Sequence, residues 1–234
     1  METTKLGQIL NPLNNSSAKC TKCGLNPRRK NSFGELASRC IRCIRIGERK
    51  ARLTAEFAEY RILKMVGSLY LDAKLDDLDQ RVQDKLKALK YGQDVFMFGP
   101  VGTGKTYAMA ALLRHYVYEG YECYRINFDE FCVKVRATMS LAVKETEWEL
   151  TEPLKTIDKL FIDDLGLRSK QETDFAYVTL YSLLNKRQER RLPTFISSNK
   201  SIDKLGQQFD ARIASRLQTA QVIEITGNDR RGAK

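Results

Sequence analysis

The apolar positions in the second half of the chain fall into five short runs, and longer amphipathic segments separate them. The runs are residues 95–98, 121–128, 159–164, 193–199 and 221–227. Strands that alternate with helices form a parallel sheet with helices on both faces. We therefore predict an α/β domain that is built on a five-stranded parallel sheet.

Two further amphipathic stretches precede these runs. Leu53, Phe57 and Tyr60 mark a helical stripe in the first stretch. The second has apolar residues at steps of three and four, which predicts one helix; they are Leu71, Leu75, Leu78, Val82, Leu86 and Leu89. We expect the leucines of the second stretch to pack against the following domain, and a partner-binding helix is the alternative.

Composition and charge narrow the class of protein. With 42% hydrophobic and 29% charged residues, the 234-residue chain has enough apolar material for a core. It contains no apolar run of roughly 18 residues and no signal-peptide segment at its start, so we expect a cytoplasmic protein without a membrane partner. Residues 19–64 hold 13 Lys or Arg against four Glu, which is +9 of the net +11. Such a basic segment favours nucleic acid or an acidic protein, although a solvated surface has the same composition.

Four of the six cysteines form two C-x-x-C pairs near the front of the chain, with sixteen residues between the pairs. They are Cys20, Cys23, Cys40 and Cys43. Two such pairs predict tetrahedral coordination of Zn²⁺, and four thiolates close the coordination sphere, so the zinc is expected to be structural. A redox pair or an iron–sulfur site lacks supporting context. Arg28, Arg29 and Lys30 form a basic tip between the pairs, which is either a contact surface or solvated.

The remaining cysteines and the single histidine suggest no further site. Cys123 and Cys132 stand apart and are interpreted as core thiols. His115 is the only histidine, so a His-based metal site or a Ser/His triad is excluded.

A phosphate-binding loop follows the first apolar run. The stretch GPVGTGKT matches G-x-x-x-x-G-K-[ST] between a predicted strand and a predicted helix. Its residues are Gly99, Pro100, Val101, Gly102, Thr103, Gly104, Lys105 and Thr106. Backbone N–H groups of such a loop surround phosphate oxygens, Lys105 reaches the β- and γ-phosphates, and Thr106 ligates Mg²⁺. The loop predicts ATP and Mg²⁺ as cofactors.

Polar residues follow the third and fourth runs. Asp163 and Asp164 end one run and Asn199 ends the other, and ligands collect at the carboxyl ends of parallel strands. Asp163 fits the residue that holds Mg²⁺ through its water shell. Asp164 can orient the water that attacks the γ-phosphate, and Asn199 can hydrogen-bond to that water or to the phosphate.

Together, the segments GPVGTGKT, LFIDDLG, SSN, ARIASRL and IEITGNDRR resemble the AAA+ ATPases of the DnaC/DnaI helicase-loader group over roughly residues 90–231. The IstB transposition ATPase shares much of this pattern. The cysteine module resembles the N-terminal domain of DnaI-type loaders, which grips the replicative helicase. IstB-like proteins usually lack such a module.

The resemblance implies roles for further residues. Asn199 takes the sensor-1 position, and Arg216 takes the position of an arginine finger, with Arg212 beside it. The two arginines are four residues apart on one face of a short predicted helix, and a salt-bridged surface pair is the alternative. Arg230 or Arg231 would be a sensor-2-like arginine that contacts the nucleotide. Asp164 departs from the commoner Glu, and its shorter reach predicts slow turnover until copies assemble.

The resemblance also implies that the region after the second run contacts single-stranded DNA. Lys134, Arg136 and Lys144 are expected there on helices, and a charged solvent-exposed face is the alternative.

The domain organisation expected from these motifs is a tail, a zinc module, a helical linker and an AAA+ ATPase domain. The boundaries are residues 1–17, 18–48, 49–90 and 91–234. The leading hypothesis is an ATPase that loads a replicative hexameric helicase onto single-stranded DNA and self-associates in its ATP state. The alternatives are an IstB-like regulator of a transposase, a zinc nucleic-acid-binding module with a P-loop that does not hydrolyse ATP, and, less favoured, a small-molecule kinase.

Overall fold

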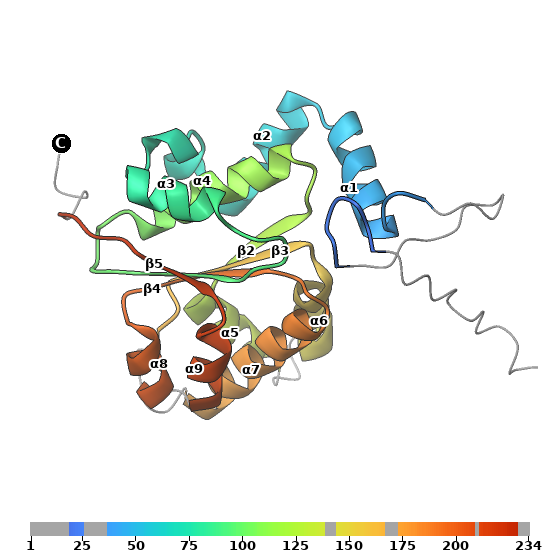
Figure 1. Cartoon of the computed structure of the whole chain (residues 1–234). Helices are drawn as coiled ribbons and strands as arrows, with labels where there is room; N and C mark the ends of the chain where they lie inside the picture. Colours follow the sequence, from blue (N-terminus) through green and yellow to red (C-terminus); the bar gives the residue numbers. More distant parts are fainter. Residues whose placement is uncertain (1–18, 26–36, 139–143, 167–172, 209–210, 229–234) are drawn as a thin grey trace, which may run out of the picture. The chain divides into compact units, whose positions relative to one another are not determined.

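The computed structural model describes residues 19–25, 37–138, 144–166, 173–208 and 211–228 (Figure 1). The chain divides into two compact units, residues 1–52 and 53–234. Helix α1 (Ile41–Arg52) belongs to the first unit, and the sheet belongs to the second. Residues 49–90, which we expected to form a linker, are divided between the two units. No helix within the described ranges has the length and apolar character needed to span a membrane.

The second unit contains the predicted five-stranded sheet. Its strands are β1 (Val95–Phe98), β2 (Cys123–Asn127), β3 (Lys159–Asp163), β4 (Thr194–Ser198) and β5 (Gln221–Glu224). They pair in the order β2-β3-β4-β1-β5, and every pair is parallel. The prediction of a parallel α/β sheet is therefore confirmed, and the carboxyl ends of β1, β3 and β4 lie along one edge.

Helices cover both faces of this sheet (Figure 1). One face carries α2 (Ala55–Val66), α3 (Gln80–Lys87) and α4 (Lys105–Tyr118). The other carries α5 (Phe128–Ala137), α6 (Glu147–Thr156), α7 (Thr173–Glu189), α8 (Ile202–Gln208) and α9 (Ala211–Leu217). Alternate strand residues face the two layers: Ile162 and Ile196 join the core with α5 and α7. Phe161 and Phe195 stack on the opposite face with ring centroids 4.6 Å apart.

The single helix predicted over residues 71–89 is wrong. Short 3₁₀ turns occupy Ser68–Tyr70 and Leu75–Asp77, and α3 begins only at Gln80. The carboxylate of Asp79 accepts a hydrogen bond from the backbone N–H of Arg81, which caps α3 at its N-terminus. A cap in the middle of the predicted stripe ends one element and starts another.

The helix predicted in the first stretch is present as α2, and the apolar stripe of Phe57 and Tyr60 faces solvent. Phe57 and Tyr60 are more than half exposed, whereas Ala58, Ile62 and Val66 are buried. The helix carries two apolar stripes, and the smaller residues form the one that packs on the domain.

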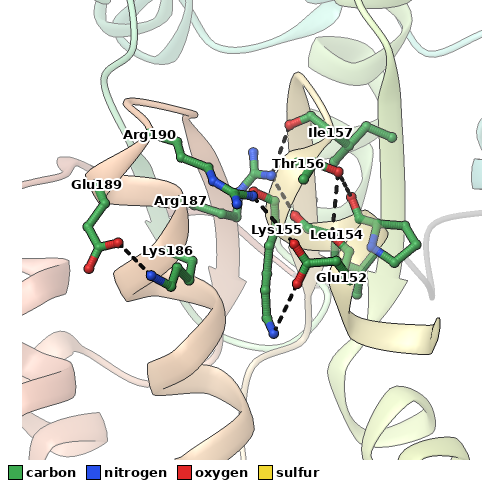
Figure 2. A network of polar contacts seen from close by, with 10 residues as sticks. Glu152, Leu154, Lys155, Thr156, Ile157, Lys186, Arg187, Glu189 and Arg190 are labelled. Carbon is green, nitrogen blue, oxygen red and sulfur yellow. Dashed lines mark hydrogen bonds and ion pairs between the residues drawn. The ribbon is translucent and has the colours of Figure 1, made fainter. Parts of the chain in front are cut away.

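A buried arginine joins the second helical layer to the sheet (Figure 2). Arg187, at the end of α7, has no solvent exposure. Its Nη1 donates to the carbonyls of Leu154 and Ile157 at 2.6 and 2.9 Å. Its Nη2 donates to the Pro193 carbonyl at 2.7 Å and its Nε to Thr194 Oγ1 at 3.0 Å. One guanidinium thus satisfies the carbonyls that α6 leaves unpaired at its end and fixes the start of β4.

Candidate nucleotide site and cysteine cluster

The four paired cysteines come together in the first unit. The sulfur atoms of Cys20, Cys23, Cys40 and Cys43 all lie within 4.8 Å of one another, and all four side chains are buried. Cys40 directly precedes α1 and Cys43 lies in its first turn, so the helix fixes the second pair. Four zinc–sulfur bonds of about 2.3 Å would place tetrahedral sulfurs about 3.8 Å apart. The distance of 3.9 Å between Cys23 Sγ and Cys40 Sγ therefore fits zinc.

Electrostatics favour a cation in this cluster. Burial raises the pKa of the Cys40 thiol and of the Cys43 thiol. Four thiolates in one buried cluster would repel each other at neutral pH, whereas a divalent cation stabilises the deprotonated form. The donor set thus fits a structural zinc ion.

The phosphate-binding loop connects β1 to α4 in the second unit, as predicted. Gly102 has φ 80° and Gly104 has φ 98°, values that favour glycine. Gly99 is required for a different reason: a Cβ there would lie 2.0 Å from the carbonyl oxygen of Ile225. The chain that leaves β5 therefore packs directly on the start of the loop.

Lys105 and Thr106 begin α4, so the helix N-terminus faces the loop. The buried Lys105 ammonium donates to the carbonyls of Gly99 and Pro100 at 2.9 and 2.6 Å. Thr103 is also buried, and its hydroxyl donates to the Pro100 carbonyl at 2.9 Å. A lysine ammonium beside free helix N–H groups forms an anion site that suits phosphate.

A pocket lies next to this loop. The start of α3, the loop and the end of β5 line it, with Leu78, Val82 and Ile225 as apolar residues and Asp79, Arg81 and Glu224 as charged ones. Its volume is about 40 Å³, below the roughly 300–1,000 Å³ of small-molecule sites, so the pocket would have to widen to hold the rest of a nucleotide.

The two carboxylates at the end of β3 have different environments. Asp163 is 2% exposed; its Oδ1 accepts from the Ser197 hydroxyl and its Oδ2 accepts from Arg125 Nη2. Asp164 is exposed and has φ 57°, so the chain turns sharply after Asp163. One carboxylate is therefore held against the sheet, and the next is presented to solvent.

The end of β4 connects the acidic turn to the phosphate loop. The Ser197 hydroxyl accepts from the Asp164 N–H at 3.0 Å, and the Ser197 carbonyl accepts from the Leu165 N–H at 2.7 Å. The Ser198 carbonyl accepts from the Gly99 N–H at 3.3 Å. Asn199 follows on the surface, with its Oδ1 3.7 Å from the position that a Cβ on Gly166 would take. The sheet thus brings the predicted Asp164 and Asn199 to one edge with the loop.

The two predicted arginines lie on α9 and share one face of it. The guanidinium carbon of Arg216 lies 4.8 Å from the ring centroid of Tyr181, and that of Arg212 lies 5.8 Å from it. Arg216 also donates to the Tyr181 hydroxyl and to Gln188 Oε1, each at 3.0 Å. Both acceptors belong to α7, so Arg216 contacts its own helical layer in this structure.

Other predicted residues lie outside the described part of the chain. These are Arg28, Arg29 and Lys30 of the basic tip, and Arg230 and Arg231 near the C-terminus.

The basic residues expected on helices around residue 140 lie only partly on helices. Lys134 and Arg136 are exposed on α5, as expected, whereas Lys144 precedes α6 and is not helical.

Sequence reasoning missed two residues that contact Asp163. Ser197 is the first residue of the SSN motif, in which only Asn199 is assigned a role from the sequence. A serine two residues before a site asparagine lies near the same edge of the sheet, which is a signal that could have identified it. Arg125 lies 38 residues from Asp163 in sequence, and only the pairing of β2 with β3 brings the two together.

The parallel sheet, the phosphate loop and the acidic end of β3 define a P-loop nucleotide-binding domain of the AAA+ ATPase type. The chain belongs to the IstB-like ATP binding protein family, which matches residues 35–233.

Individual relatives include both helicase loaders and transposition proteins. The chain is 30% identical over 168 residues to the replicative helicase loader DnaI of Bacillus subtilis, covering 65% of this chain and 53% of DnaI. It is 28% identical over 177 residues to an IS21-like insertion-sequence ATP-binding protein of Bacteroides fragilis, covering 73% of this chain and 64% of that protein. The chain thus spans about half to two thirds of the length of these relatives.

A solved structure supports the fold. The crystal structure of the DnaI aligns with a TM-score of 0.57 and 23% identity, over 69% of this chain and 92% of that chain.

Proposed function

We propose that this protein is an ATP-dependent loader that places a replicative hexameric helicase onto single-stranded DNA. The observation that carries the proposal is the four-cysteine cluster in a unit of its own, ahead of the ATPase unit. The similarity to a protein named as a replicative helicase loader supports it. In this proposal the cysteine unit holds the helicase and the ATPase unit responds to the nucleotide.

The site residues have defined roles in the proposed reaction. Lys105 and the N-terminus of α4 bind the phosphates, and Thr106 and Asp163 would hold Mg²⁺. The metal ion would neutralise charge that develops on the transferred phosphoryl group. The exposed Asp164 orients the attacking water, and Asn199 contacts the water or the γ-phosphate from the neighbouring strand end.

Arg216 completes the site of an adjacent copy in this proposal. An arginine supplied in trans accelerates phosphoryl transfer by ~10³–10⁵. Because Arg216 contacts α7 within its own chain, it must leave Tyr181 and Gln188 to reach another copy. Hydrolysis is therefore expected to be slow in the monomer and to rise on self-association.

The first test is complex formation with a cognate replicative helicase, measured by size exclusion with multi-angle light scattering. It is run with and without a non-hydrolysable ATP analogue, on the wild type, on Cys40→Ser and on Cys132→Ser. Cys132 is a buried cysteine of the second unit, so its variant controls for the chemical change alone. A stoichiometric complex that only Cys40→Ser abolishes supports a loader whose cysteine unit binds the helicase.

A regulator of a transposase is the second candidate, and the match to the IS21-like ATP-binding protein favours it. Absence of a helicase complex under every condition, together with ATP-dependent binding to a transposase, would establish this candidate instead. A phosphate-release assay separates both from a protein that binds ATP without hydrolysing it.

A further inference from the structure

Arg125 joins the helix at the start of the ATPase unit to the acidic end of β3. From β2, its Nη1 donates to the Met65 carbonyl at 3.2 Å and its Nη2 donates to Asp163 Oδ2. Met65 lies in the last turn of α2, where a helix has carbonyls without intrahelical partners. One guanidinium therefore contacts both the end of α2 and the carboxylate expected to hold Mg²⁺.

This ion pair is shielded from solvent. The side chain of Asp163 is 3% exposed and that of Arg125 is 20% exposed. Arg125 Nε is buried and has no hydrogen-bond partner among the described residues, so the pair and the Met65 carbonyl determine where the guanidinium lies. An ion pair at this depth is screened far less than one on the surface.

Arg125 and the expected Mg²⁺ compete for the negative charge of Asp163. A carboxylate next to a divalent cation binds it through its negative charge, and here a guanidinium already offsets that charge. Arg125 also carries the same sign of charge as Mg²⁺. Ser197 donates to the other carboxylate oxygen, so both oxygens of Asp163 have a protein partner.

We propose that Arg125 is a positioning residue that restrains Asp163 and sets the magnesium dependence of nucleotide binding, with the end of α2 holding the guanidinium in place. The inference rests on the proposed nucleotide function and deepens it by assigning a regulatory contact. A change at α2 that withdraws the Met65 carbonyl would loosen the guanidinium and release Asp163 for the metal ion.

The test compares the dissociation constant of a fluorescent ATP analogue in excess Mg²⁺ with that in buffer freed of Mg²⁺ by a chelating resin before the protein is added, so that the zinc stays bound. The dissociation constant without Mg²⁺ divided by that with Mg²⁺ is the magnesium enhancement. Both constants are measured on the full-length zinc-loaded protein. Arg125→Gln removes a positive charge beside the expected Mg²⁺ position, so the loss of Coulomb repulsion is expected to raise the enhancement about tenfold. The dissociation constant without Mg²⁺ should change less than about twofold, because Lys105 and the loop bind the phosphates. If circular dichroism shows that Arg125→Gln is unfolded, Arg125→Lys is measured instead, and its enhancement should rise by a smaller factor because one ammonium cannot reach both acceptors.

Arg114→Gln is the matched control. Arg114 also joins α2 to the domain, through Glu59 at 2.5 and 2.8 Å and the Leu71 carbonyl at 2.7 Å, and none of these acceptors belongs to β3. Its variant should keep the wild-type enhancement.

Three results would overturn the inference. They are an unchanged or reduced enhancement in Arg125→Gln, a parallel loss of affinity with and without Mg²⁺, and a rise of equal size in Arg114→Gln. A wild-type protein that binds no nucleotide in either condition would instead refute the proposed nucleotide function itself.

Discussion

Arg187→Met tests whether the buried guanidinium between α6, α7 and β4 stabilises the ATPase unit. Methionine keeps most of the apolar stem but removes the charge and all donors. The carbonyls of Leu154, Ile157 and Pro193 then lose a donor in the interior. We expect the free energy of unfolding to fall by several kcal/mol.

The magnitude follows from the contacts. Hydrogen bonds from a charged donor contribute about 1.5–3 kcal/mol each, and Arg187 makes four of them. The cost of desolvating the guanidinium offsets part of that sum, and each buried carbonyl left without a donor costs about 1–3 kcal/mol. We therefore expect a loss of about 4 kcal/mol, equivalent to about 8–16 °C in Tm for a unit of this size.

Arg190→Met is the matched control, because Arg190 lies three residues further along the chain (Figure 2). Its side chain is 44% exposed, donates to the Lys155 carbonyl at 3.2 Å and lies 3.7 Å from Glu152. Exposed pairs of this kind contribute about 0–1 kcal/mol. The free energy of unfolding of both variants is measured by urea denaturation, with far-UV circular dichroism as the signal. A loss below about 1 kcal/mol in Arg187→Met, or equal losses in the two variants, would refute the reasoning.

The candidate sites lead to three further predictions. Lys105→Ala should weaken nucleotide binding about 10–150-fold, which corresponds to the loss of one hydrogen bond from a charged group. Titration with a fluorescent nucleotide measures the affinity, and wild-type affinity in this variant would contradict the role of Lys105. Asp164→Asn should keep ATP binding within about threefold and lose at least ~10² in turnover; phosphate release at the wild-type rate would remove Asp164 from the mechanism. Cys40→Ser should lower the zinc content measured by atomic absorption from one ion per chain and leave nucleotide affinity unchanged, because the cluster belongs to a separate unit; full zinc content in this variant would contradict the assigned ligands.

Local patterns in the sequence predicted the strands, the phosphate loop and the cysteine cluster. Each of these features depends on residues that are neighbours in sequence or that recur at a fixed spacing, as in the loop from Gly99 to Thr106. The contact of Arg125 with Asp163 could not be predicted in this way. It depends on β2 lying beside β3 with Asn127 opposite Asp163, so that Arg125 projects from the same face of the sheet two residues earlier.

Periodicity predicted the α2 helix but not which of its faces is buried. A spacing of three and four identifies a stripe, but α2 has two of them. Phe57 and Tyr60 are larger, yet they are exposed, and the stripe with Ala58 and Ile62 is the buried one. The choice between stripes depends on the shape of the surface opposite, which the sequence of α2 does not contain.

The backbone at Asp164 restricts how this acidic turn can vary. At φ 57° a side chain carries steric strain, which Asp and Asn tolerate better than most residues because their short side chains hydrogen-bond locally. A glutamate would reach further toward the nucleotide, but it would add strain to a turn that the N–H groups of Asp164 and Leu165 fasten to Ser197. A longer acid at position 164 would therefore require a different turn. Asparagine keeps this backbone conformation, so Asp164→Asn removes the charge that is proposed to orient the water and leaves the turn itself in place.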